Sequence, residues 1–155
     1  MRADMQRTLT MLILLTLTAA PSYGQQVAAA PADTLRVWQS LWSTTGFKYQ
    51  HGPRKGDVGL GGYAVKGIVQ DDPAALHEAE VFGRYQVPTF FLSLASCVVI
   101  GAGLAKDRSE LIYAGIGGLA VSFAFDQVGY SHLKKAARTY NASKSSGAAA
   151  ALSDK

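Results

Sequence analysis

His77, Glu78 and Glu80 form the first cluster whose residue types could do chemistry. Imidazole and carboxylate groups serve as metal ligands and as acid–base catalysts. A helix brings ligands to one face only at spacings of three or four, as in H-E-x-x-H, and the second histidine is missing here. A solvated helix face is the simpler interpretation, so neither a metal nor a cofactor is expected. A small enzyme that uses His77 with Glu78 or Glu80 stays open as an alternative.

Two further features invite a chemical interpretation and favour a structural one. The glycine-rich stretch Gly56–Gly62 lacks the Lys-Ser/Thr ending of a phosphate-binding loop and any clear preceding strand, so it is interpreted as a flexible loop. Cys97 is the single cysteine, which excludes an internal disulfide. Because it lies in an apolar run, we expect a small packed side chain rather than a reactive thiol.

Asp126 is a carboxylate at the end of an apolar run, and such groups are candidates for function when they lie in a membrane. It continues the row Ala114, Gly118 and Ser122, which points it toward the preceding helix, opposite Thr89 to Ser93. A structural cap satisfied by a hydroxyl group and interfacial water is the favoured interpretation. A proton or ion site is the alternative.

The elements that position Asp126 are two uncharged stretches. Residues 88–105 carry no charge, nor do residues 111–125. Eighteen helical residues reach about 27 Å, close to the thickness of a bilayer's hydrocarbon layer. The sequence therefore predicts an antiparallel transmembrane hairpin of helices 88–105 and 110–128, with a tight turn in which Asp107 and Glu110 have the spacing of a capping box.

Small residues recur at intervals of four on both helices and predict close helix packing. The first row is Ser93, Cys97, Gly101 and Ala105, and the second is Ala114, Gly118 and Ser122. Gly103, Gly115 and Gly117 lie off these rows and suggest contact with another copy. A second alternative is therefore a homo-oligomer that forms through the glycine faces. Such an oligomer could be a small channel or transporter, with Asp126 near its mouth.

The N-terminus has the order of a secretory signal peptide. Arg2 and Arg7 precede the apolar stretch 9–17, and the small-residue end Ser22-Tyr23-Gly24 follows, so residues 1–24 are predicted to be removed. An uncleaved anchor is the alternative. Residues 25–34 are interpreted as a flexible linker.

Residues 35–87 are predicted to form a small exported segment with little β structure. Leu35, Trp38, Leu41 and Trp42 have helical spacing, whereas residues 47–50 alternate as in a strand and precede a turn. Asp72 followed by Pro73 predicts a helix that begins at about residue 73. Its apolar face includes Phe82 and Gly83, and His77, Glu78, Glu80 and Arg84 are expected in water.

The C-terminal segment 129–141 is predicted to be an amphipathic helix at the membrane interface. Leu133, Ala136, Ala137 and Tyr140 share one face, and the cations Lys134, Lys135 and Arg138 are expected to contact lipid phosphates. Residues 142–155 are rich in Ser, Ala and Gly and are predicted to be disordered.

The composition agrees with a membrane protein of the mainly α class. Apolar residues make up 48% and charged residues 17%, against roughly 25% charged in soluble domains. Burial of both apolar helices in a soluble fold is the alternative, but the rest of the chain is short and polar. No long basic stripe is present, so nucleic acid is not an expected partner.

Two signals in the sequence predict opposite membrane topologies. A signal peptide exports residues 25–87 and the tail and leaves the loop 106–110 in the cytoplasm. The positive-inside rule favours the opposite, because the tail carries Lys134, Lys135, Arg138 and Lys144 and the loop only Lys106 and Arg108. Exported ends in the inner membrane are preferred. Association with the outer membrane and two cytoplasmic ends are the alternatives.

The signal peptide, the helix started by Asp72-Pro73, the Gly-rich hairpin and the Ala-x-x-Tyr-Asn ending at Ala137–Asn141 resemble a diffuse group of small exported bacterial membrane proteins. The resemblance implies no activity and no site residue. The expected function is that of a membrane-anchored bacterial envelope protein with a non-catalytic structural or interaction role, and its expected partners are membrane lipid and another envelope protein.

Overall fold

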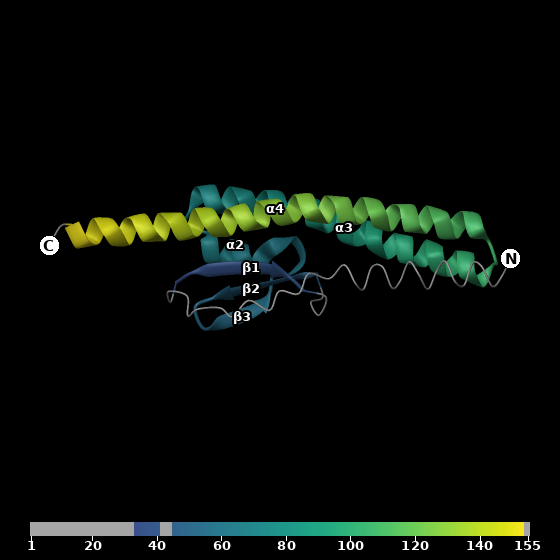
Figure 1. Ribbon diagram of the computed structural model, residues 1–155, viewed down its shortest axis with the longest axis horizontal. Coiled ribbons are helices and arrows are strands. Elements are labelled where there is room, and N and C mark those ends of the chain that lie inside the picture. Colours follow the sequence, from purple (N-terminus) through teal and green to yellow (C-terminus); the bar gives the residue numbers. More distant parts are fainter. Residues whose placement is uncertain (1–32, 41–44, 154–155) are drawn as a thin grey trace.

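The computed structural model describes residues 33–40 and 45–153, with side chains through residue 147. The protein is mainly helical and elongated: two long helices, α3 (Pro73–Ala105) and α4 (Ser109–Ser153), run antiparallel side by side (Figure 1). A small sheet and the short helix α2 (Tyr63–Val69) pack at one end of the pair. The predicted signal peptide (1–24) and linker residues 25–32 lie outside the described residues.

The sheet has three antiparallel strands in the order β1-β2-β3. Strand β1 (Leu35–Gln39) pairs with β2 (Phe47–His51), which pairs with β3 (Arg54–Asp57). The strand and turn predicted at residues 47–54 are confirmed. The helix predicted from Leu35 is wrong, because Leu35 and Val37 also alternate along a strand and the β2 backbone pairs with them; Leu41 and Trp42 lie outside the described residues.

The glycine-rich stretch is an ordered turn and not a flexible loop. After β3 the chain forms the 3₁₀ helix η1 (Leu60–Gly62) and enters α2. Gly62 has a φ of 75°, and a Cβ added there would lie 2.8 Å from the Phe82 ring. Only glycine combines that backbone conformation with so close an approach.

Helix α3 begins where the sequence predicted. The Asp72 side chain accepts hydrogen bonds from the backbone N–H groups of Ala74 (3.1 Å) and Ala75 (3.0 Å), and Pro73 occupies the first turn. The predicted boundary at residue 88 is absent, since Pro88 lies within one continuous helix. Next to Pro88, the Thr89 hydroxyl donates a hydrogen bond to the Tyr85 carbonyl oxygen (2.7 Å). This side-chain bond gives the helix backbone an additional partner beside the proline.

The turn between the long helices uses Asp107 differently from the predicted capping box. Asp107 has a φ of 52°, and the backbone N–H of Arg108 donates to the Gly103 carbonyl (2.8 Å). These features close α3 as a Schellman motif, with Asp107 in the left-handed position after the cap. Helix α4 begins two residues later, at Ser109, and Glu110 lies in its first turn.

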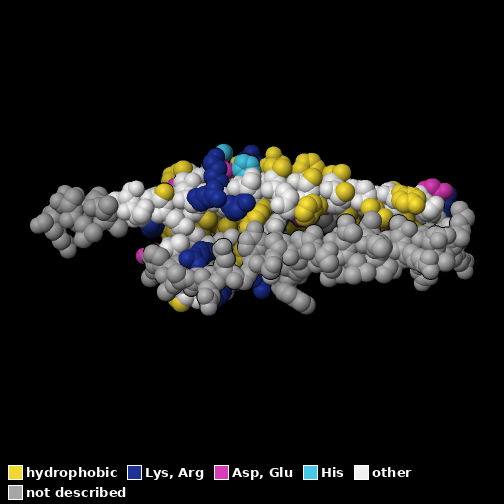
Figure 2. All heavy atoms as spheres, in the orientation of Figure 1, with side chains coloured by type: hydrophobic (Ala, Val, Ile, Leu, Met, Phe, Trp, Pro, Cys, Tyr) yellow, Lys and Arg dark blue, Asp and Glu magenta, His cyan; other side chains and the backbone are white. Residues whose placement is uncertain are grey.

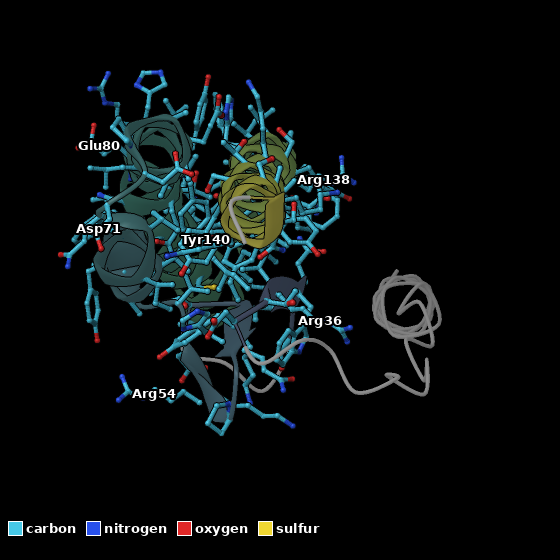
Figure 3. The ribbon with its side chains drawn as sticks, turned by 90° about the vertical axis from the view of Figure 1, so that its left-hand side faces the viewer. Arg36, Arg54, Asp71, Glu80, Arg138 and Tyr140 are labelled. Atoms are coloured by element: carbon cyan, nitrogen blue, oxygen red, sulfur yellow. The ribbon has the colours of Figure 1, made fainter. Side chains whose placement is uncertain are left out.

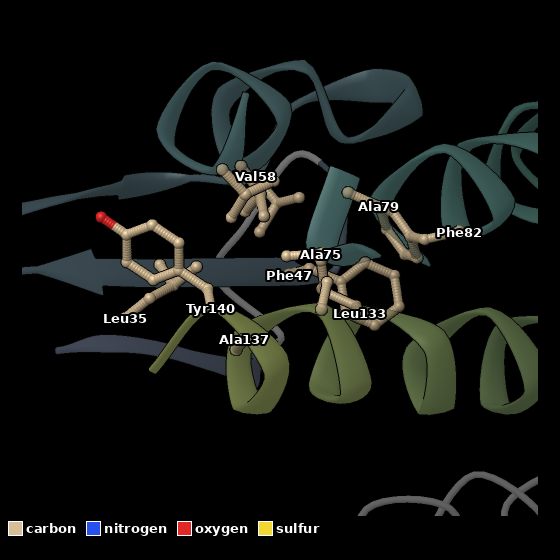
Figure 4. Packing of buried hydrophobic residues seen from close by; sticks show 12 residues of the cluster. Leu35, Phe47, Val58, Ala75, Ala79, Phe82, Leu133, Ala137 and Tyr140 are labelled. Carbon is tan, nitrogen blue, oxygen red and sulfur yellow. The ribbon is translucent and has the colours of Figure 1, made fainter. Parts of the chain in front are cut away.

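Helix α4 is continuous to Ser153. The predicted helix boundaries at residues 129 and 141 are therefore wrong, as is the disorder predicted from residue 142. Its predicted amphipathic face faces protein and not lipid. Leu133, Ala136, Ala137 and Tyr140 are at most 5% exposed and pack with residues of the sheet, α2 and α3 (Figure 4). An apolar stripe at helical spacing indicates that a face is covered, and the sheet supplies the cover here.

We call this end of the molecule the head (residues 35–40, 45–86 and 129–147) and the remaining hairpin the shaft (residues 87–128). The head has one core, built from both ends of the chain. Phe47 packs edge-on against Phe82 of α3 (5.3 Å between centroids) and stacks on Tyr130 of α4 (5.6 Å). The core of the head therefore depends on the pairing of α3 with α4.

Candidate functional site

The shaft exposes a large apolar surface. Except for Leu60 and Tyr63, the exposed large hydrophobic side chains of the described residues all lie between Phe90 and Val128; examples are Phe91, Leu94, Val98, Tyr113 and Phe123. Figure 2 shows hydrophobic side chains along the described part of the hairpin, and Lys and Arg gathered over the part of α4 beside the head.

Both long helices are long and apolar enough to cross a membrane. In their most apolar 18-residue windows, 17% of α3 and 11% of α4 is buried inside the protein. The core helix of a soluble protein is mostly buried, whereas these segments are mostly bare. The shaft is therefore the candidate membrane-embedded surface.

Inside the shaft the helices touch through small residues, but the interface contains only Gly118 and Ser122 of the second predicted row and little of the first. On α4, Gly118 meets the Ser96 side chain and Ser122 is 2% exposed. Of the first row, Cys97 and Ala105 are exposed and Gly101 has open space where a side chain would be; Ala114 of the second row is exposed too. Ser93 is half-buried.

The contacts on α3 follow a spacing of seven, through Thr89, Ser96 and Gly103. A row with a spacing of four drifts about 40° around the helix at each step, whereas a spacing of seven stays almost on one line. For this reason the row that begins at Ser93 leaves the interface.

Two glycines that were expected to contact another copy lie in the intramolecular interface. A Cβ added at Gly103 would lie 2.8 Å from Ile112, and one added at Gly115 would lie 2.8 Å from the Ser96 carbonyl oxygen. Gly117 faces open space.

In the head, Glu78 links the two long helices. Its carboxylate lies 2.7 Å from Nδ1 of His132 and 2.6 Å from Nζ of Lys135, both on α4. Because an ionised carboxylate only accepts, Nδ1 of His132 donates. These hydrogen bonds hold the pKa of Glu78 below its ordinary value, and the bond from His132 has the largest effect. Burial acts in the opposite direction.

Of the residues expected in water, His77, Glu80 and Arg84 are exposed as predicted, but the prediction for Glu78 is wrong. Glu78 is 9% exposed, His77 is exposed, and the histidine that meets Glu78 is 54 positions away. The His132 ring also stacks on Tyr85 of α3 (5.9 Å between centroids), and Tyr85 stacks on Phe125 (6.3 Å). The described residues contain no group of three His, Cys, Asp or Glu side chains suited to a metal ion.

The cations predicted to contact lipid phosphates have different surroundings. Lys135 pairs with Glu78, and Nζ of Lys134 lies 4.5 Å from the centre of the Tyr130 ring. Arg138 is exposed and points away from the protein, as does Glu80 on α3, whereas Tyr140 points between the elements of the head (Figure 3).

The Tyr-Asn ending holds the sheet to α4. The Asn141 side chain bonds both backbone groups of Leu35, and the Tyr140 hydroxyl lies 3.3 Å from Nε2 of His51. Sequence reasoning noticed the ending only as a resemblance and did not find these partners.

Asp126 lies at the junction of head and shaft. It borders a cavity of about 200 Å³ together with Gln86, Phe90 and Ser93 of α3 and with Thr45 and Gly46 before β2. Asp126 was predicted to lie opposite Thr89 to Ser93, and it lines the same cavity as Ser93. The Gln86 side chain is 3% exposed; its carbonyl oxygen accepts from the backbone N–H of Gly61, and its buried amide nitrogen has no partner among the described residues.

The chain matches no family model, no curated protein and no solved structure. The resemblance to small exported bacterial proteins therefore stays a prediction, and the geometry alone carries the functional argument.

Proposed function

We propose that the protein is a membrane-anchored envelope protein whose shaft spans a bilayer and holds the head at the membrane surface. The head acts by contact with lipid or with another envelope protein, and not by catalysis. The observation that carries the proposal is the distribution of apolar side chains: among the described residues, the head exposes only Leu60 and Tyr63 of its large apolar side chains, whereas most of those of the shaft are exposed.

The physical argument is the cost of leaving the shaft in water. Burying one large apolar side chain is worth roughly 1.5–3 kcal/mol, and the shaft exposes Phe91, Leu94, Val98, Phe123 and others together. A contiguous patch of this size is unusual on a soluble monomer. Acyl chains cover such a surface without a partner protein.

The contacts of Glu78 support a structural role for the most reactive-looking group of the head. His132, Lys135 and the stacked Tyr85 tie α3 to α4 around it. His77, the residue that the enzymatic alternative requires, is exposed.

The proposed location is the inner membrane, with head and C-terminus exported. The signal-peptide pattern of residues 1–24 supports this orientation, and the outer membrane remains the alternative. The positive-inside rule opposes this orientation, because the tail carries Lys134, Lys135 and Arg138.

The experiment that tests the proposal compares Val98→Lys with Tyr63→Lys in membranes washed with alkaline carbonate. The two side chains are 64% and 70% exposed, so in water both changes are nearly neutral. Near the centre of a bilayer a lysine costs roughly 2.5–3.5 kcal/mol. We expect wild type and Tyr63→Lys to remain in the membrane and Val98→Lys to be partly released or degraded. Release of the wild type overturns the proposal.

A further inference from the structure

Alternation along the strands divides the side chains of the sheet between two faces. Leu35, Val37, Phe47 and Tyr49 pack with the core of the head. Gly56 belongs to the same inner face, since a Cβ added there would lie 3.1 Å from the Tyr49 ring. The residues between them are not buried, and they form the outer face: Arg36, Trp38, Lys48, Gln50, Lys55 and Asp57.

The strand register arranges the outer face in two rows. The direct neighbours across the strands are Arg36, Gln50 and Lys55 in one row and Trp38, Lys48 and Asp57 in the other. We call Arg36, Lys48 and Lys55 the sheet cations. Three cations against one carboxylate give the face a positive charge, and Figure 3 shows Arg36 pointing away from the helices.

The sheet cations have no ion pair within the part of the chain that the structure describes, although Asp57 lies directly opposite Lys48. Two lysines of α4 differ in this respect. Lys135 pairs with Glu78, and Lys134 lies over a tyrosine ring. The sheet therefore presents charges that can meet an anionic surface.

The orientation of the outer face excludes the bilayer as that surface. Strands β1 and β2 run nearly along the direction of α3 and α4 (Figure 1). A face that contains this direction stands at right angles to the membrane plane when the shaft crosses a bilayer. What binds there lies beside the head and not beneath it.

Two further properties of the outer face favour a protein over a sugar polymer. Sites for small ligands are usually concave, and the cavities of about 400 and 200 Å³ border none of the residues of this face. Trp38 and Arg36 belong to the residue types that contribute most of the binding energy in protein interfaces.

We propose that the outer face of the sheet binds an acidic segment of another envelope protein, with the sheet cations on its carboxylates and Trp38 against its apolar part. The inference rests on the proposed function, because the insertion of the shaft turns the face sideways. The face is about 17 Å long and about 10 Å across, which is less than a standard protein interface covers. The contact is therefore transient, and a covalent trap is needed to detect it.

The test places benzoylphenylalanine, a photoreactive residue, at Gln50 in the middle of its row, and native cells are then irradiated. Gln70, exposed at the end of α2, takes the same residue as the control. Mass spectrometry gives the sequence of the peptide joined to each position. We expect position 50 to yield a peptide rich in Asp and Glu from one envelope protein, and position 70 not to yield it. A lipid or sugar adduct at position 50, the same adduct at both positions, or no protein adduct overturns the inference.

The charge of the outer face should control the yield of this adduct. In the chain labelled at position 50, the combined changes Arg36→Gln, Lys48→Gln and Lys55→Gln should lower the yield roughly tenfold, as expected from the loss of three exposed ion pairs. An unchanged yield would contradict the role of the sheet cations.

The matched control removes one arginine and two lysines elsewhere on the head. Its changes are Arg84→Gln, Lys134→Gln and Lys144→Gln, all at exposed positions, and it should keep the yield. Equal losses in the two triple variants would mean that net charge alone attracts the partner, and the assignment to the outer face would be wrong.

A salt series in washed native membranes checks the same contact with the sheet cations in place. Raising the salt from about 0.1 M to about 1 M shortens the screening length from roughly 10 Å to roughly 3 Å. The yield at position 50 should fall several-fold, and a yield independent of salt would contradict a contact made by charge.

Carbonate washing separates this inference from the proposed function. A chain that stays in the membrane but gives no acidic adduct contradicts only the inference, whereas release of the wild type overturns the proposed function.

Discussion

Asn141, near the end of the head's part of α4, hydrogen-bonds both backbone groups of Leu35 in β1, a residue 106 positions earlier. Its side-chain oxygen accepts from the Leu35 N–H (2.8 Å), and its side-chain nitrogen donates to the Leu35 carbonyl (2.9 Å). The amide thus acts as a neighbouring strand for one residue and fixes the edge of the sheet to the helix.

Asn141→Ala should destabilise the head by about 1–3 kcal/mol, because two partly buried backbone groups lose their partner. Trp38 lies in β1, so tryptophan fluorescence during unfolding in detergent micelles reports on this contact. Ser145→Ala, an exposed serine on the same helix, is the control. Equal midpoints for the two variants would show that the amide contact does not stabilise the sheet.

Glu78 should make the stability of the head depend on acid pH. Its pKa in the folded protein is lowered, so its contribution is complete above the ordinary value of 4.5 and is lost as the pH falls through the folded value. Unfolding midpoints measured from about pH 6 down to about pH 3 should fall less steeply in Glu78→Gln than in wild type.

The matched control for this pH profile is Glu80→Gln, an exposed carboxylate on the same helix, which should keep the wild-type slope. At neutral pH, Glu78→Gln should cost about 1–2 kcal/mol, since the side chains of His132 and Lys135 are 30% and 65% exposed and water replaces part of their loss. If the unfolding midpoints of Glu78→Gln and Glu80→Gln fell equally steeply with pH, Glu78 would not be the cause of the acid dependence.

The packing of the shaft predicts opposite effects for two glycines of α4. Gly115→Ala places a Cβ 2.8 Å from the Ser96 carbonyl oxygen and should destabilise the hairpin by about 1–3 kcal/mol. Gly117→Ala meets nothing within 4 Å and should be neutral or gain up to about 1 kcal/mol from helix propensity. Unfolding with increasing SDS, followed by circular dichroism, measures both; a larger loss at Gly117 would place the interface on the other face.

A comparison of alanine substitutions at two glycines with left-handed backbone distinguishes the cost of backbone strain from the cost of a steric clash. Gly46 and Gly62 have φ values of 77° and 75°, but a Cβ at Gly46 meets nothing within 4 Å, whereas one at Gly62 meets Phe82. Gly46→Ala should cost about 1–2 kcal/mol of strain. Gly62→Ala should cost about 1–3 kcal/mol more, from the clash. Thermal unfolding of both variants checks the difference, and equal losses would contradict the position of Phe82.

Local signals in the sequence predicted the elements whose cause is local. Asp72 and Pro73 start α3 because capping needs only neighbouring residues, and the alternation at residues 47–50 gives β2. The two charge-free stretches correspond to the shaft. Asp126 was placed toward α3 by helical periodicity alone.

What the sequence could not supply is the partner of each surface. The stripe from Leu133 to Tyr140 fits lipid and protein equally well, and the choice depends on a sheet whose first strand resembled a helix. Glu78 looked solvated because its partners, His132 and Lys135, lie on a helix more than fifty positions away. The row from Ser93 failed because its spacing drifts around α3.

Cys97 allows the most direct test of the central claim, that the shaft lies among acyl chains. It is the single cysteine of the chain, it is exposed, and it lies near the middle of the apolar part of α3. In sealed membranes, a membrane-impermeant maleimide should leave Cys97 unlabelled while labelling a cysteine placed at Ser145 in a Cys97→Ser background. Prompt labelling of Cys97 in those membranes would mean that the shaft lies in water, and the account would be wrong.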